Sequence, residues 1–315
     1  MNRRLLGGTG LEISVVGFGA WAIGGGGYEW GWGPQDDADS IAAIERALES
    51  GVNWIDTAPI YGFGRSEEVV GRTIAKMSEK PFIFTKCGLE GRDGNSVKEL
   101  KAATIERQCE DSLRRLGVEA IDLYQIHWPD PDEDLEEGWA ACVALLSAGK
   151  VRHIGVSNFD IAQLERANAV ATVETLQPPY SLINRGVEDE ILPYCGAEGI
   201  GVIAYSPMGS GLLTGAFSAE RVAALPEDDF RSHAAHFQQP ELSRNLAAAE
   251  RLRQVGERHD ASPGAVAVSW VLRDPVVSGA IVGLRRFDQV GGILPAAGEL
   301  ELSAEEIAFI EGDGA

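Results

Sequence analysis

The chain has 315 residues, of which 44% are hydrophobic and 24% are charged, so it is long enough to bury a large core without disulfide support. Its formal net charge of −21 argues against binding to nucleic acid or to anionic membranes, because their phosphates repel an acidic surface. The sequence has no apolar run of membrane-spanning length and no signal-peptide core at its start, so we expect a cytoplasmic protein.

Eight short apolar runs rich in Val, Ile and Phe recur along the chain and predict buried strands. They cover residues 15–18, 52–55, 82–85, 121–126, 151–156, 173–176, 201–204 and 279–282. A glycine-rich segment at 4–11 precedes the first run and predicts a small hairpin.

Amphipathic segments between these runs predict helices. Residues 40–50 carry an apolar stripe and end before Gly51, which is a typical stop signal, and residues 97–116 form a longer amphipathic face. Two further helix starts are predicted by Ser262-Pro263 and by the capping-box pair Ser303 and Glu306.

Strands that alternate with helices predict a parallel sheet, and the length suits an α/β fold of the (β/α)8 barrel type, with an N-terminal hairpin and long loops at the C-terminal face. We expect residues 1–315 to form one barrel domain with a loop insertion at about 217–240. A doubly wound sheet is the alternative, because Gly17, Gly19 and Ala22 match a dinucleotide fingerprint. A glycine run follows where that fingerprint needs a helix, which favours the barrel.

Polar residues follow the downstream ends of the predicted strands, where barrel enzymes place their active sites. Four of them form a candidate catalytic quartet: Asp56, Tyr61, Lys86 and His127. An ammonium favours phenolate, so Lys86, held by Asp56, should lower the pKa of Tyr61. A neutral His127 can hydrogen-bond to a substrate oxygen. Each residue alone has an ordinary structural explanation, but their joint placement favours a site for proton transfer.

Several linked motifs resemble those of the aldo-keto reductase superfamily, and among its members the prokaryotic enzymes most of all. They are DTAPIYGFGRSE at 56–67, TK at 85–86, QIHWP at 125–129, GVSNF at 155–159 and YSPM at 205–208. The resemblance covers nearly the whole chain. It implies an oxidoreductase that transfers a hydride between a nicotinamide and an aldehyde, ketone, sugar or alcohol, with Tyr61 as general acid and base.

The same resemblance implies a set of cofactor-binding residues on the remaining strand ends. They are Gly19, Ala20, Trp21, Asp56, Ser157, Asn158, Gln177, Tyr205, Ser206, Pro207, Met208, Gly209, Ser210, Gly211, Leu212, Gly283, Arg285, Arg286 and Gln289. The adjacent Arg285 and Arg286 favour NADP over NAD, because guanidinium forms bidentate pairs with phosphate. Ile293 stands where the family often has an asparagine that contacts adenine, which leaves NAD as the alternative cofactor.

The loop after the first strand is unusually aromatic and predicts walls of a substrate pocket. The substrate-binding set is Trp21, Tyr28, Trp30, Trp32, Tyr61, His127 and Trp128. The insertion contains His233 and His236, but no clear helix that would fix metal ligands, so we expect no metal and a mobile loop over the site.

Two other functions stay open at this point. A cofactor-binding regulatory subunit with little turnover is disfavoured by the intact quartet. A barrel fold can also support a lyase that forms a Schiff base on Lys86, but the cofactor motifs argue against this function.

Overall fold

The computed structural model describes residues 1–312 and confirms a closed parallel barrel. Its strands are β3 (Val16–Gly19), β4 (Trp54–Asp56), β5 (Phe82–Cys87), β8 (Ile121–Ile126), β9 (Val151–Ser157), β10 (Thr175–Gln177), β11 (Gly201–Tyr205) and β12 (Val277–Gly283). They are hydrogen-bonded in the order β10-β11-β12-β3-β4-β5-β8-β9, and the ring closes between the last and the first. Each predicted run overlaps one of these strands, and the closed ring rules out the doubly wound alternative.

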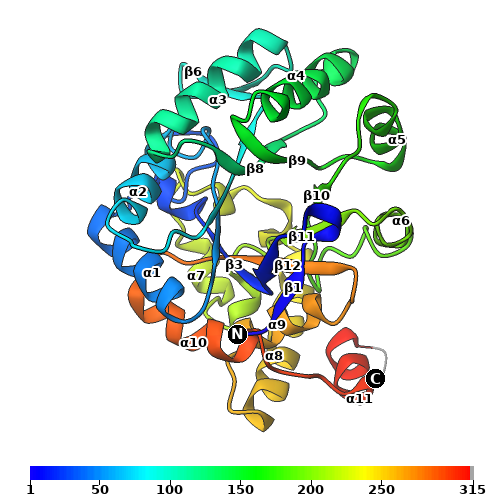
Figure 1. Cartoon of the computed structure of the whole chain (residues 1–315). Helices are drawn as coiled ribbons and strands as arrows, with labels where there is room; N and C mark the ends of the chain where they lie inside the picture. Colours follow the sequence, from blue (N-terminus) through cyan, green and yellow to red (C-terminus); the bar gives the residue numbers. More distant parts are fainter. Residues whose placement is uncertain (313–315) are drawn as a thin grey trace.

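Helices surround the barrel, and α1 to α6 follow one another around its outside in chain order (Figure 1). The helices are α1 (Asp37–Glu49), α2 (Arg65–Ile74), α3 (Ala102–Leu116), α4 (Leu135–Ser147), α5 (Ile161–Val170), α6 (Ile191–Glu198), α7 (Ala219–Ala223), α8 (Glu241–Arg258), α9 (Pro263–Leu272), α10 (Phe287–Ala297) and α11 (Ala304–Glu311). Ser262 caps α9 and Ser303 forms a capping box with Glu306 on α11, as predicted. Within residues 1–312, no helix combines the length and apolarity needed to cross a bilayer.

The predicted N-terminal hairpin closes the bottom of the barrel. It consists of β1 (Arg3–Leu5) and β2 (Glu12–Ser14), which pair in antiparallel fashion. Its buried Leu6 and Ile13 join the interior side chains in one cluster with Trp54, Phe84, Leu123, Ile203 and Ile281. The Trp54 indole N–H donates to the Ser14 carbonyl at 2.7 Å and fixes the ring. The N-terminal end of the barrel is therefore filled, and open space is left to the C-terminal end of the strands.

The predicted helix at 97–116 is wrong at its start. Its first two residues, Val97 and Lys98, lie in the second strand of a hairpin formed by β6 (Leu89–Arg92) and β7 (Asn95–Lys98), and α3 begins only at Ala102. The turn between these strands has left-handed φ angles of 52° at Asp93 and 83° at Gly94. Two such residues in succession are what a type I′ hairpin turn requires, and Asp-Gly is its preferred sequence. The Asp93-Gly94 turn therefore places Val97 in a strand, although the helical pattern of apolar residues includes it.

A close approach between Gly17 and Trp54 generates a stability prediction. A methyl group added at Gly17 would lie 2.2 Å from the Trp54 ring, which is fully buried and held by Ser14. We expect Gly17→Ala to lower the free energy of unfolding by about 1–3 kcal/mol, as overpacked cores do, in urea denaturation.

Gly8→Ala is the matched control, because an added methyl there meets no atom within 4 Å. It should change the free energy of unfolding by less than about 0.5 kcal/mol. Equal stabilities of the two variants would contradict this account of the packing.

Candidate active site

A cavity of about 740 Å³ lies at the C-terminal ends of the barrel strands, a size typical of small-ligand sites. Every strand end, or the loop directly after it, contributes to its lining. One such residue from each strand in chain order is Gly19, Asp56, Leu89, His127, Ser157, Gln177, Tyr205 and Gly283. The predicted convergence of the strand ends on one rim is therefore present in the fold.

The four residues of the catalytic quartet meet at one side of this cavity. Lys86 Nζ donates to Asp56 Oδ1 at 2.5 Å, to the Thr57 carbonyl at 3.0 Å and to the Tyr61 hydroxyl at 3.2 Å. Three acceptors match the three N–H groups of an ammonium, so the geometry suits a charged Lys86. Lys86 is fully buried and Asp56 is 2% exposed. The His127 ring stands edge-on to Tyr61, with 5.8 Å between the ring centroids.

The second oxygen of Asp56 is held by two glutamines. Gln177 Nε2, from β10, donates to Asp56 Oδ2 at 2.8 Å. Gln125 Nε2, from β8, lies 3.4 Å from the same oxygen and forms a long hydrogen bond. Gln125 is brought there by register, because it pairs with Lys86 across β5 and β8. Both carboxylate oxygens therefore have donors, which fixes the carboxylate and with it the ammonium.

Burial sets the protonation state of the quartet. Loss of hydration, reinforced by the nearby Asp56 carboxylate, raises the pKa of Tyr61 well above its usual value. The expected lowering of this pKa by Lys86 is therefore wrong, because a buried phenolate next to a carboxylate is strongly disfavoured. Burial, and then the Lys86 charge, lowers the pKa of His127 well below 6.5, so its imidazole is neutral near pH 7. Burial also lowers the pKa of Lys86, and Asp56 opposes this shift.

A polar patch built from β9, β10 and β11 adjoins His127. Asn158 Nδ2 donates to the His127 carbonyl at 2.9 Å, and Ser157 Oγ donates to the Gln177 carbonyl at 2.7 Å. The Tyr205 hydroxyl donates to Asn158 Oδ1 at 2.9 Å. Asn158 has a φ of 64°, and strained backbone of this kind clusters at functional sites. Ser157, Asn158, Gln177 and Tyr205, which all belong to the predicted cofactor-binding set, thus form one connected group.

The loop after β11 has a backbone suited to an anion. Ser206, Gly209 and Ser210 each have a φ of 56°, and Gly211 has a φ of 92°. Left-handed residues of this type occur in the concave N–H arrays that bind phosphate groups. Arg221, Arg231 and Arg285 also line the cavity and supply the local positive charge that an acidic protein needs to bind an anion. These features fit a pyrophosphate-containing dinucleotide.

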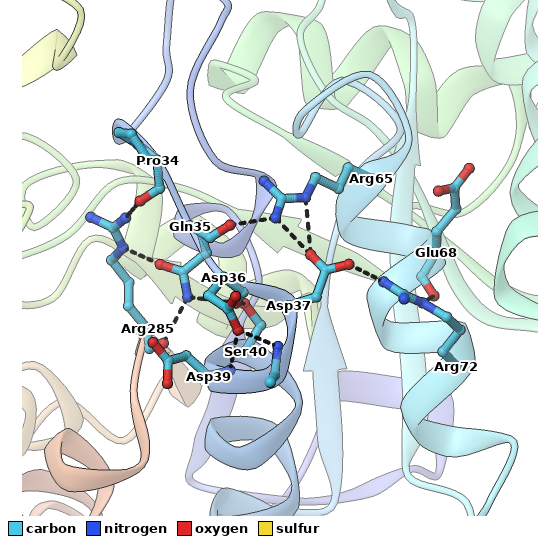
Figure 2. A network of polar contacts seen from close by, with 11 residues as sticks. Pro34, Gln35, Asp36, Asp37, Asp39, Ser40, Arg65, Glu68, Arg72 and Arg285 are labelled. Atoms are coloured by element: carbon cyan, nitrogen blue, oxygen red, sulfur yellow. Dashed lines mark hydrogen bonds and ion pairs between the residues drawn. The ribbon is translucent and has the colours of Figure 1, made fainter.

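Arg285 and Arg286 have different environments although they are adjacent. The guanidinium of Arg285 donates to Gln35 Oε1 at 2.7 Å and to the Pro34 carbonyl at 2.5 Å (Figure 2). Arg286 does not line the cavity, and its exposed guanidinium pairs with Asp288 at 3.1 Å. The Gln289 side-chain oxygen accepts from the backbone N–H of Arg285 at 2.8 Å and of Arg286 at 3.1 Å, which orders the start of α10.

All seven residues predicted to bind the substrate line the cavity, namely Trp21, Tyr28, Trp30, Trp32, Tyr61, His127 and Trp128. The Trp21 ring stacks near Tyr61 at 6.3 Å and meets Trp32 edge-on at 5.2 Å. Phe230, from the insertion, packs against Trp21 at 4.9 Å and against Trp32 at 5.1 Å. The insertion thus covers the aromatic wall through the short turn η5 (Phe230–Ser232). Its other elements, α7 and η6 (Ala235–Phe237), contribute Val222 and Phe237 to an apolar cluster with Leu212.

Some predicted site residues lie outside the cavity lining: Ala20, Lys86, Gly209, Leu212 and Arg286. Leu212 is fully buried in an apolar cluster with Phe237, whereas Lys86 reaches the cavity through Tyr61. Sequence reasoning missed several lining residues: Glu29, Leu89, Ser96, Lys98, Phe217, Arg221 and Arg231. The Asp-Gly turn could have revealed the hairpin that carries Leu89, Ser96 and Lys98. No comparable pattern in the sequence indicates that Phe217, Arg221 and Arg231 of the insertion line the cavity.

Comparisons with known proteins agree with this architecture. The model of the aldo/keto reductase family matches residues 15–312. The aldo-keto reductase YhdN of Bacillus subtilis (strain 168) is 39% identical over 293 residues, which cover 92% of this chain and 87% of that protein. The structure of the glycerol dehydrogenase AKR11B4 from Gluconobacter oxydans has a TM-score of 0.87 at 39% identity and covers 98% of this chain and 94% of that one.

A second solved structure is similar at lower identity. The holo form of the aldo-keto reductase AKR11C1 from Bacillus halodurans has a TM-score of 0.81 at 26% identity and covers 99% of this chain and 96% of that one. The family match over nearly the whole chain agrees with the motifs and with the barrel. The chain therefore belongs to the aldo/keto reductase family and is an NAD(P)-dependent oxidoreductase that acts on CH–OH groups.

Proposed function

We propose that this protein is an NADP-preferring carbonyl reductase, reversible as an alcohol dehydrogenase, in which Tyr61 exchanges the proton. The observation that carries the proposal is the hydrogen bond from Lys86 Nζ to the Tyr61 hydroxyl, within a buried Lys86–Asp56 pair. Lys86 is occupied as an ammonium and does not line the cavity, which argues against a Schiff-base lyase.

The hydrogen-bond directions define the proton donor. A bound nicotinamide cofactor supplies the hydride that reaches the carbonyl carbon. The Tyr61 oxygen accepts a hydrogen bond from Lys86, so its own O–H is left to donate to the substrate oxygen. As negative charge grows on that oxygen, Tyr61 releases its proton, and the ammonium stabilises the phenolate that remains. His127 is neutral and donates one ring N–H to the same oxygen.

The cavity walls favour a small aldehyde or ketone, including sugar-like ones. Trp21 and Trp128 offer apolar faces beside Tyr61 and His127. Glu29, Ser96 and Lys98 add polar groups that suit hydroxyls. The similarity to a glycerol dehydrogenase supports hydroxylated substrates, so glyceraldehyde and glycerol belong in a test panel with benzaldehyde and simple ketones.

Removal of the Tyr61 hydroxyl tests the proton donor. We expect Tyr61→Phe to lower kcat for aldehyde reduction about 10²–10⁴-fold, which is the usual contribution of general acid catalysis. The Kd of NADPH, measured by tryptophan fluorescence quenching, should stay within about threefold of the wild-type value, because cofactor contacts are kept. Tyr194→Phe on α6 is the control and should keep wild-type kcat. Substantial turnover by Tyr61→Phe would exclude this residue as the donor.

The pKa shifts predict a broad pH plateau. Tyr61 acts as an acid below its pKa, which is raised above 10, and His127 is neutral above its pKa, which lies below 6.5. At saturating NADPH, kcat for reduction should therefore be flat between about pH 6.5 and 9.5. A titration of kcat with a midpoint near pH 6.5 would contradict a neutral His127, and one below pH 9 would contradict a site in which Tyr61 is protonated and Lys86 is charged.

The same His127 shift predicts a loss of stability in acid. Below about pH 6.5 the unfolded chain binds a proton at this histidine that the folded protein does not, so the free energy of unfolding falls as the pH decreases. The fall should be smaller in His127→Gln, measured by urea denaturation at several pH values. An equal fall in both proteins would contradict the assignment.

The exposed Arg286 is our candidate for the 2′-phosphate of NADP. We expect Arg286→Ala to raise the Kd of NADPH about tenfold or more, in line with the loss of a charged hydrogen bond, and to leave the Kd of NADH within about twofold. Arg114→Ala, an exposed arginine on α3, is the control and should change neither value. Wild-type preference for NADH would overturn the choice of NADP.

A further inference from the structure

The segment between β3 and α1, residues 20–36, supplies most of the aromatic wall of the cavity and is called the aromatic loop below. Glycines occupy positions 24–27, 31 and 33, so the backbone has little stiffness of its own. Two of its buried donors, Tyr28 OH and Trp32 Nε1, have no hydrogen-bond partner within residues 1–312. Unpaired buried donors cost free energy, so the loop depends on attachments from outside to keep this conformation.

Arg285 provides such an attachment from the opposite end of the sequence. Its Nε donates to Gln35 Oε1 at 2.7 Å, its Nη1 to the Trp32 carbonyl at 2.9 Å and its Nη2 to the Pro34 carbonyl at 2.5 Å. Gln35 Nε2 donates back to the Arg285 carbonyl at 2.9 Å. All three guanidinium nitrogens are therefore engaged with the last residues of the aromatic loop.

A second arginine, Arg65 on α2, also binds Gln35 (Figure 2). Arg65 Nη2 donates to the Gln35 carbonyl at 2.5 Å, and its Nε donates to Asp37 Oδ1 at 3.1 Å. Gln35 also reaches α1 through Ser40 Oγ at 3.0 Å. Gln35 thus lies between two guanidinium groups, and Arg285 is the one that connects it to the loop after β12.

The attachment acts on the substrate wall through Trp32. Arg285 holds the Trp32 carbonyl, and the Trp32 ring packs edge-on against Trp21, which stacks near Tyr61. Arg231 also stacks on the Trp32 ring at 4.6 Å, so Arg285 is one of two arginines that hold this residue. Release of the Trp32 carbonyl would loosen the packing of the ring against Trp21 and Phe230 and widen the space beside the reacting oxygen. Replacement of Arg285 can therefore alter the space beside Tyr61 through this series of direct contacts.

We propose that Arg285 is a positioning residue that holds the aromatic loop closed against the cavity and thereby sets the affinity for substrate. The inference rests on the proposed function, because it assigns the aromatic loop to substrate binding. Arg285 affects substrate binding and not the chemical step, so its replacement should change the KM for the substrate more than kcat.

The test compares Arg285→Ala, Arg285→Lys and Gln35→Ala with the wild type. Lysine keeps the charge but cannot reach three acceptors in the planar arrangement of a guanidinium. Hydrogen–deuterium exchange at peptides covering residues 21–36 reports closure of the loop, and peptides from α8 serve as an internal control for global stability. Kinetics with glyceraldehyde or benzaldehyde, whichever the wild type reduces faster, and NADPH titrations complete the measurements.

We expect Arg285→Ala and Arg285→Lys to speed exchange in the aromatic loop about tenfold with no change in α8. Arg285 also lines the cofactor end of the cavity, so the kinetics are measured at NADPH concentrations that the titrations show to saturate each variant. Under these conditions the KM for the aldehyde should rise about tenfold, with kcat within about threefold, because a misplaced wall weakens substrate binding but leaves the quartet intact. Gln35→Ala should give a smaller change of the same kind, since the two backbone acceptors remain.

Two outcomes would overturn the proposal. One is loop exchange and KM in Arg285→Ala that match Arg114→Ala, the exposed-arginine control. The other is wild-type behaviour in Arg285→Lys, because charge alone would then suffice and the three directed hydrogen bonds would not matter. A failure of the Tyr61 proposal would appear separately, as turnover by Tyr61→Phe, while the exchange measurements would still decide the role of Arg285.

Discussion

The buried ion pair between Lys86 and Asp56 is the interaction on which the rest of the site depends. Two charges in the interior are expensive unless every donor and acceptor is satisfied, at several kcal/mol per ion. Here the partners come from three barrel strands or the loops after them: Thr57 and Tyr61 after β4, Gln125 on β8 and Gln177 on β10. Only a closed barrel brings these strand ends to a single point, so the fold and the protonation state of Lys86 are physically linked.

This pairing also explains why Tyr61 is a neutral acid at rest. A lone ammonium would favour phenolate, but Asp56 accepts from the same Lys86 nitrogen and offsets its charge at the phenol. Burial then dominates and raises the pKa of Tyr61. The proton is therefore retained until negative charge develops on a substrate oxygen, when the ammonium has a phenolate to stabilise. The attraction of Lys86 for a phenolate could be inferred from the sequence, whereas the burial of the whole group is a property of the fold.

The barrel and the quartet could be predicted because their signals are local. Each strand is a compact apolar run, and the polar residue that follows it is adjacent in sequence. The hairpin β6–β7 was missed because helical periodicity was followed past an Asp-Gly turn. The contacts of Arg285 with the aromatic loop could not be predicted, since two of its acceptors are backbone carbonyls, of Trp32 and Pro34, which any residue would offer. Likewise, nothing in the composition of the insertion indicates that Phe230 packs between Trp21 and Trp32.

The arginines of the cavity connect its two ends. In a chain with a net charge of −21, a binding site for an anion needs cations that local structure holds in place. Arg231 pairs with Asp229 and stacks on the Trp32 ring at 4.6 Å, while Arg285 holds the Trp32 carbonyl. The cations suited to an anionic cofactor thus also fix the indole that walls the substrate space. Electrostatic attraction at one end and shape at the other are therefore properties of the same few side chains, and neither can change without the other.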